Sequence, residues 1–165
     1  MKIHLRKSTL FILLISFSLL SGAQKVNNFK AKDINFQTKS FNDLKGSKLT
    51  IIDFWATWCK PCIQAIPKLS FLYKKYKGNG LEIIGINTDS PRNSAKVSSF
   101  VKIHKMKYSI LRDSDSKLAR SLNVSAFPTL FIVNSENVIV YMHIGFKIGD
   151  EKIIEGEIKK LLNES

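Results

Sequence analysis

The stretch DFWATWCKPC, residues 53–62, joins an apolar run to the start of a helical pattern. Cys59 and Cys62 are the only two cysteines of the chain. Residues 49–56 predict a buried strand, and residues 63–77 predict a helix. A thiol at a helix N-terminus is stabilised as a thiolate by unpaired N–H groups and by the helix dipole, and a second thiol one turn later can close a disulfide with it. The stretch therefore predicts dithiol–disulfide exchange.

The N-terminus has the pattern of a secretory signal. Three basic residues lie within the first seven positions, residues 10–20 are apolar apart from two serines, and residues 21–23 are small. The apolar stretch is shorter than the roughly 20 residues of a membrane span. We therefore expect residues 1–23 to be a signal peptide, with an uncleaved anchor as the alternative, and residues 24–165 to form one domain. This pattern is shared by proteins of the bacterial periplasm and of the eukaryotic secretory lumen, and we expect export to the periplasm or cell envelope of a bacterium.

Export does not make the two cysteines a structural staple. In an oxidising compartment a disulfide can serve stability alone. However, a bridge between Cys59 and Cys62 closes a very small loop, which removes little entropy from the unfolded chain. Such a disulfide is better suited to being opened and closed.

The chain is strongly basic, with 26 Lys and Arg against 13 Asp and Glu and a net charge of +13. The lysines are scattered over different predicted elements, and no arginine-rich block or nucleic-acid motif accompanies them. We interpret the charge as a solvated basic surface and expect no nucleic-acid partner.

Periodicity along the rest of the chain predicts an α/β fold. Strands are expected at 34–37, 49–56, 81–87, 108–111, 129–133 and 138–143. Helical segments are expected at 41–46, closed by a glycine, and at 63–77, 97–104, 115–122 and 150–162, the last burying Ile153, Ile154, Ile158, Leu161 and Leu162. Strands that alternate with helices and then end in a hairpin indicate a partly parallel sheet with an antiparallel edge.

Residues 53–62 resemble the active-site segment of the thioredoxin superfamily, and FPTL at residues 127–130 is similar to its cis-proline segment. The segment DLKG at residues 43–46 and the long insert after Asn87 resemble the exported TlpA/ResA-like branch. The resemblance covers residues 28–163. It implies a thioredoxin-like fold, with a central mixed sheet flanked by helices and an insert between the second core strand and the cis-proline strand.

The residue types fit a dithiol site. Cys59 is expected to be the exposed nucleophile, with Lys60 as a nearby cation that favours its thiolate. Cys62 is expected to be the more buried resolving thiol, which attacks the mixed disulfide. Pro61 suits the first turn of a helix, where its missing N–H costs nothing.

Four further residues complete the expected site. Asp53 stands in an apolar run, so burial is expected to raise its pKa, and thioredoxins use an aspartate here to exchange a proton with the resolving thiol. The resemblance also implies a cis bond between Phe127 and Pro128, facing the cysteines and binding an extended substrate chain. Trp58 is expected to flank the sulfur and to shape the contact surface.

The leading hypothesis is an exported thiol–disulfide oxidoreductase that works without a cofactor, reduces disulfides of partner proteins, receives electrons from a membrane-bound donor and is a monomer. Ala65 replaces a glutamate that several ResA-like relatives carry, which favours a general rather than a specialised role. The alternatives are a peroxidase-type relative and a binding module, either a chaperone or a metal carrier. We expect no metal site, and we interpret His104 and His143 as structural, partly exposed histidines.

Overall fold

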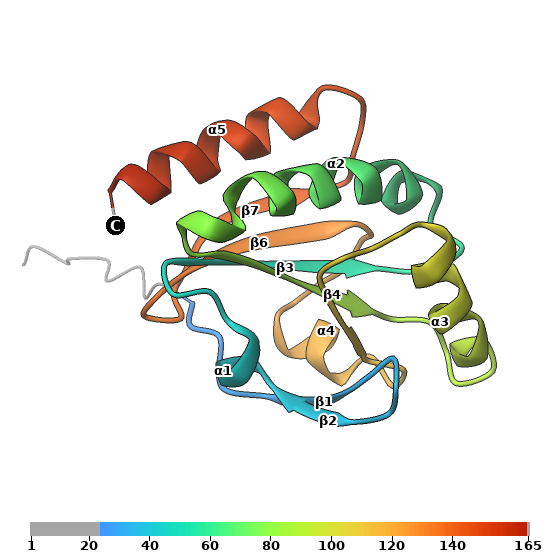
Figure 1. The fold of residues 1–165 in the computed structure, drawn as a ribbon. Helices are drawn as coiled ribbons and strands as arrows, with labels where there is room; N and C mark the ends of the chain where they lie inside the picture. Colours follow the sequence, from blue (N-terminus) through green and yellow to red (C-terminus); the bar gives the residue numbers. More distant parts are fainter. Residues whose placement is uncertain (1–23, 165) are drawn as a thin grey trace, which may run out of the picture.

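The described residues form a seven-stranded mixed sheet in the order β2-β1-β5-β4-β3-β6-β7, and most of its strands are labelled in Figure 1. The computed structural model describes residues 24–164, so the expected signal peptide lies outside the described residues. The strands are β1 (Lys30–Asp33), β2 (Thr38–Ser40), β3 (Leu49–Trp55), β4 (Leu81–Asn87), β5 (Ser109–Arg112), β6 (Thr129–Asn134) and β7 (Ile139–Ile144). The helices are α1 (Phe41–Leu44), α2 (Lys60–Tyr76), α3 (Ser94–Ile103), α4 (Lys117–Ser121) and α5 (Asp150–Asn163), with a 3-10 turn, η1 (Lys77–Asn79).

Strand directions confirm the predicted mixed sheet. β3, β4 and β5 are parallel neighbours, whereas β6 and β7 run antiparallel and form one edge. The β1–β2 hairpin adds a second antiparallel edge beside β5. The expected insert corresponds to α3 and β5, which lie between β4 and the strand that follows Pro128.

Two apolar layers cover the sheet. Every residue of β3 is buried, and its alternate side chains point to opposite faces. Ile51 and Trp55 pack in the layer that contains residues of α2, α3 and α5. Ile52 and Phe54 pack in the layer that contains residues of α1 and α4. Asp53 belongs to the same row as Ile51 and Trp55, so its carboxyl lies beneath α2.

Three local predictions were wrong. Residues 34–37 are the turn of the β1–β2 hairpin, because the Asp33 carboxylate accepts N–H bonds from Asn35 and Gln37 at 2.8 and 2.9 Å. Ile153 is 53% exposed, since it lies on the outer side of α5. The α1 helix ends at an extended Lys45 instead of a glycine cap.

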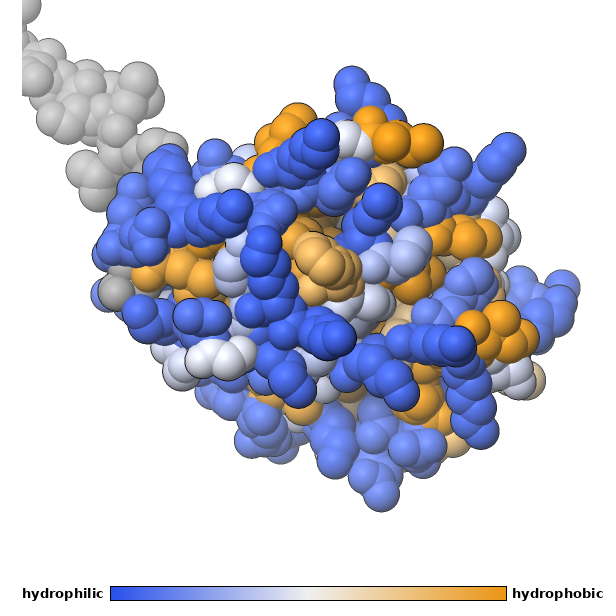
Figure 2. Space-filling view, turned by 45° about the horizontal axis from the view of Figure 1, so that its top comes forward, coloured by the Kyte–Doolittle hydropathy of each residue, from blue (hydrophilic) through white to orange (hydrophobic). Residues whose placement is uncertain are grey.

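The surface view shows mostly hydrophilic side chains, with apolar ones in small separate patches (Figure 2). This agrees with lysines that are scattered along the sequence. Within residues 24–164, no helix combines the length and the hydropathy needed to cross a membrane.

Candidate active site

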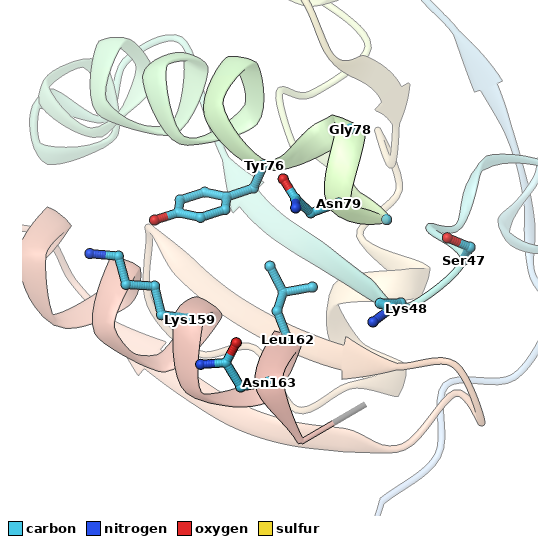
Figure 3. A pocket seen from close by; sticks show the side chains of 9 residues that line it. Ser47, Lys48, Tyr76, Gly78, Asn79, Lys159, Leu162 and Asn163 are labelled. Carbon is cyan, nitrogen blue, oxygen red and sulfur yellow. The ribbon is translucent and has the colours of Figure 1, made fainter.

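A surface hollow of ≈ 600 Å³ lies at the C-terminal end of α2, beside η1 and α5 (Figure 3). Its walls include Lys48, Tyr76, Lys159 and Leu162, and among residues 24–164 no cysteine or carboxylate lines it. The two cysteines lie at the opposite, N-terminal end of α2. The chemistry predicted from the sequence is therefore located at that end.

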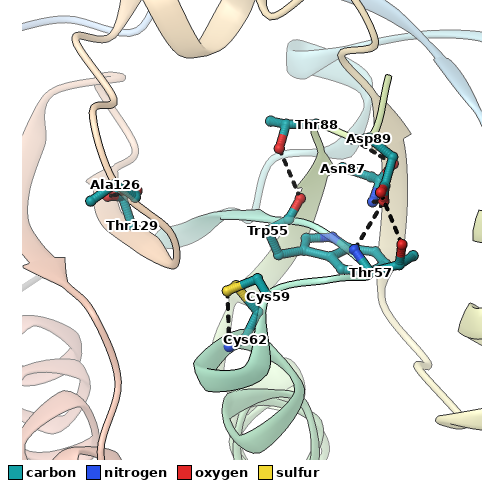
Figure 4. Close-up of a disulfide and its surroundings, with 9 residues drawn as sticks. All are labelled: Trp55, Thr57, Cys59, Cys62, Asn87, Thr88, Asp89, Ala126 and Thr129. Atoms are coloured by element: carbon teal, nitrogen blue, oxygen red, sulfur yellow. Dashed lines mark hydrogen bonds between the residues drawn. A yellow bond between two sulfur atoms is a disulfide. The ribbon is translucent and has the colours of Figure 1, made fainter. Parts of the chain in front are cut away.

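Cys59 and Cys62 form a disulfide at the first turn of α2 (Figure 4). Cys59 is the N-cap residue, and its sulfur accepts the backbone N–H of Cys62 at 3.2 Å. The helix starts at Lys60, three residues earlier than expected, and Pro61 occupies its first turn. Because a helix N-terminus favours negative charge, this position stabilises a Cys59 thiolate once the disulfide is reduced.

The prediction of an exposed Cys59 was wrong for this disulfide form. Cys59 is 5% exposed and Cys62 is 1% exposed, so the order of accessibility holds although both are buried. Both belong to the apolar layer against which Phe127 packs, and this accounts for the low exposure. Lys60, by contrast, is exposed at the start of the helix.

The loop before Cys59 is held by a buried carboxylate. Asp89 accepts hydrogen bonds from the backbone N–H and the hydroxyl of Thr57, both at 2.9 Å, and from the Asn87 amide at 2.7 Å (Figure 4). Asp89 is fully buried, and sequence reasoning treated it only as a loop residue. Asp89 is 30 positions from Cys59 in the sequence, so its contact with the loop before Cys59 could not be predicted. The contact depends on the pairing of β3 with β4.

The bond between Phe127 and Pro128 is cis, as the resemblance to the thioredoxin superfamily implied. The Thr129 hydroxyl donates to the carbonyl of Ala126 at 2.8 Å and closes this loop just before β6 (Figure 4). Phe127 meets Trp58 edge to face, with ring centroids 6.0 Å apart. Trp58 is 65% exposed. The loop and the disulfide therefore share one end of the molecule, with an exposed aromatic surface between them.

Asp53 is buried, as expected, with 2% of its surface exposed. Its Oδ1 atom has no hydrogen-bond partner within the described part of the chain. Desolvation raises the pKa of Asp53 to about 7. A carboxyl with this pKa exchanges its proton near neutral pH, which suits a group that accepts a proton from a thiol.

Comparisons with known proteins show the family to which the chain belongs. The family model described as the AhpC/TSA family matches residues 23–142. The chain belongs to the AhpC/TSA family. It is 33% identical over 134 residues to thiol-disulfide oxidoreductase ResA of Bacillus cereus, covering 81% of this chain and 75% of that protein. Against ResA of Bacillus subtilis the identity is 31% over 126 residues, covering 76% and 69%.

Solved structures of other proteins have the same fold as this member of the AhpC/TSA family. A thioredoxin-like protein from Porphyromonas gingivalis superposes with a TM-score of 0.72 at 30% identity, covering 85% of this chain and 93% of that one. The thioredoxin domain of a thiol-disulfide oxidoreductase from Bacteroides vulgatus superposes with a TM-score of 0.71 at 24% identity, covering 85% and 96%. The fold is thioredoxin-like, and the protein is a thiol–disulfide oxidoreductase.

A second residue near the site, besides Asp89, was missed by sequence reasoning. His143 lies in β7, 81 positions after Cys62, and it lines a small cavity together with Asp53, Ala65 and Pro128. As expected, its side chain is only partly exposed. The alternation of β7 signals an inward-facing position, but only the pairing of three strands places that position beside Asp53.

Proposed function

We propose that the protein is exported and reduces disulfide bonds in partner proteins by cycling Cys59 and Cys62 between dithiol and disulfide. The observation that carries this proposal is the disulfide at the N-cap of α2, with the Phe127–Pro128 loop at the same end of the molecule. Trp58, Lys60, Pro61 and Phe127 would contact the substrate chain, and the backbone next to Pro128 would bind it in an extended form.

In the first step the Cys59 thiolate attacks one sulfur of a substrate disulfide. A bond forms between Cys59 and that sulfur, the substrate disulfide breaks, and one substrate thiolate leaves. The N-terminus of a 17-residue helix stabilises the attacking thiolate.

In the second step Asp53 acts on Cys62. The Asp53 carboxylate accepts the thiol proton of Cys62, and the resulting thiolate attacks the sulfur of Cys59. The second substrate thiolate leaves, and the protein has given up two electrons as its own disulfide closes. The raised pKa of Asp53 supports this role, because it brings the carboxyl closer in basicity to a thiol.

The next cycle requires a dithiol donor. We propose a membrane-bound reductant, because an exported protein is separated from cytosolic reductants. Export itself is supported by the basic, apolar and small-residue pattern of residues 1–23. We further propose that the protein acts as a monomer.

The test is an in-cell trap. Cys62→Ser keeps the nucleophile but cannot resolve the mixed disulfide, so partner proteins stay bound to Cys59 and can be identified by mass spectrometry. Cys59→Ser is the matched control and is expected to trap none. The mature protein is expected in the envelope fraction with Gln24 at its N-terminus.

The direction is read from the trapped partners. If the protein is a reductant, their cysteines accumulate as disulfides in cells that lack it. Partners that become more reduced in its absence would show an oxidant and contradict the proposed direction.

A further inference from the structure

Asp53 and His143 lie in one row across the sheet. Asp53 of β3 is paired with Leu130 of β6, and Leu130 is paired with His143 of β7. Residues that are directly opposite on neighbouring strands point to the same face. With strands ~4.8 Å apart, the Asp53 and His143 backbones are roughly 10 Å apart, and both side chains face α2 and α5.

A narrow cavity joins the two side chains. It measures ≈ 10 Å³ and is lined by Asp53, Ala65, Leu69, Pro128 and His143, among others. This volume is about the space that one water molecule needs. The wall contributed by α2 is small and apolar, so the polar groups of the cavity come from Asp53 and His143.

The bonds of His143 define which ring nitrogen is available. Its Nε2 lies 3.0 Å from Asp150 of α5, whose pKa is lowered by the backbone N–H of Lys147 and by His143 itself. An ionised Asp150 only accepts, so the neutral ring carries its hydrogen on Nε2. Nδ1 is then an acceptor, and its contact with the Tyr141 hydroxyl is long, at 3.3 Å. Nδ1 is therefore the atom on which the ring can take up a proton.

We infer that Asp53 exchanges its proton with solvent through His143, a positioning residue that Asp150 orients. This inference rests on the proposed role of Asp53. Asp53 must be a carboxylate before it can take the proton of Cys62, so it first passes its own proton to a water in the cavity, and that water passes one to Nδ1 of His143. The imidazolium is stabilised by the Asp150 carboxylate and releases the proton to solvent, because the side chain is 17% exposed. One proton leaves Asp53, and Asp53 is again a carboxylate.

The other titratable groups around the path do not replace His143. From β7, Tyr141 faces the ring, and desolvation raises its pKa. On the β5 side Tyr108 is buried, and desolvation, followed by the charge of Asp53, raises its pKa well above the ordinary value. Among the cavity-lining residues, α2 and β6 contribute only apolar side chains. On the α5 side the charged groups are Asp150 and Lys147, which interact with each other, and Glu157, which acts on Tyr141. His143 is the titratable side chain that lines the cavity together with Asp53.

The test follows each thiol separately. The dithiol protein is mixed with one equivalent of the chromogenic disulfide dithiobis-nitrobenzoate in a stopped-flow instrument. Attack by Cys59 releases the first coloured thiolate, and attack by Cys62 on the mixed disulfide releases the second. His143→Gln is expected to slow the second phase about fivefold near neutral pH and to leave the first phase unchanged. This loss is smaller than the ~10²-fold or more that a direct general acid or base contributes, because His143 acts only through Asp53. The matched control is His104→Gln, which alters a histidine stacked on Phe100 and is expected to change neither phase.

A double-mutant cycle separates this inference from the proposed function. If His143 acts through Asp53, His143→Gln has no further effect on the second phase in the Asp53→Asn background. An equal loss in both backgrounds would indicate a merely structural role and overturn the inference. No loss in His143→Gln, while Asp53→Asn slows the second phase, would also overturn it and leave the role of Asp53 intact. If Asp53→Asn is itself without effect, the proposed function of Asp53 fails, and this inference with it.

A second variant keeps the test independent of folding. Asp150→Asn removes the carboxylate that stabilises the imidazolium, and it is expected to slow the second phase in the same direction. Melting temperatures of all variants show whether a loss comes from unfolding. If Asp150→Asn runs at the wild-type rate in a folded protein, the inference is wrong.

Discussion

Replacement of Asp53 by asparagine should stabilise the disulfide form at neutral and alkaline pH. Burial raises the pKa of Asp53 from 3.8 to about 7. Between these two values the unfolded chain releases the proton while the folded protein keeps it. The free energy of unfolding of the wild type therefore falls as the pH rises through this window and levels off above it.

The size of the effect follows from the same two values. Each pH unit between them corresponds to ~1.4 kcal/mol, so the ionised carboxylate destabilises the folded protein by about 4 kcal/mol at and above pH ~8. Asparagine has no charge to bury. The advantage of Asp53→Asn should grow from near zero at pH ~4 to about 4 kcal/mol at pH ~8.

Urea unfolding at a series of pH values measures this difference. Other groups with shifted pKa values, such as Asp113, are present in both proteins and cancel. The matched control is Asp115→Asn, which removes an exposed carboxylate whose pKa is lowered by Lys117. Its difference from the wild type should stay flat between pH ~5 and pH ~8. A flat difference for Asp53→Asn as well would show that burial does not raise the pKa of Asp53.

Three further changes test the packing, the ion pairs and the contact surface. Gly85→Ala should lower the free energy of unfolding by about 1–3 kcal/mol, because a Cβ there would lie 2.7 Å from Ile110 Cδ1 and 3.0 Å from Trp55 Nε1. The control, Gly156→Ala, adds a Cβ with nothing within 4 Å and should instead stabilise α5. An unchanged urea midpoint for Gly85→Ala would count against this packing. Glu155→Gln should cost about 1 kcal/mol at neutral pH, because the hydrogen bonds from Lys75 and Tyr76, both at 2.7 Å, lower the pKa of Glu155 to about 2. The loss should shrink as the pH falls below ~4.5 and vanish near pH ~2, and a pH-independent loss in urea titrations would disagree. Trp58→Ala should reduce kcat/KM for a protein disulfide about tenfold while leaving the reaction with a small disulfide unchanged, and equal effects on both would argue against a role in contacting the substrate chain.

Much of the fold could be predicted, because most strands and helices follow from patterns among residues that are close in the sequence. The apolar run of β3 and the helical period of α2 are visible in sequence, and the structure confirms both elements. The start of α2 was placed too late, because the capping sulfur of Cys59 and the fit of Pro61 in the first turn set it. Apolar alternation misled at residues 34–37, where the Asp33 carboxylate organises a turn.

Features that depend on strand pairing were harder to predict. Asp89 and His143 are far from the cysteines in sequence, and each reaches the site only through its neighbouring strands. The burial of Cys59 likewise depends on the apolar layer against which Phe127 packs. The burial of Asp53 was predicted correctly, because a single carboxylate within a buried strand is itself a local signal.

The proposed mechanism requires Cys59 to attack the substrate disulfide and Cys62 to resolve the mixed disulfide. Catalysed reduction of insulin disulfides with dithiothreitol as electron donor tests it most directly, with wild type, Cys59→Ser and Cys62→Ser compared at equal concentration. We predict turnover by the wild type alone, together with a stoichiometric mixed disulfide on Cys59 in the Cys62→Ser protein. Turnover by Cys59→Ser, or a mixed disulfide that forms on Cys62 in preference to Cys59, would contradict the account.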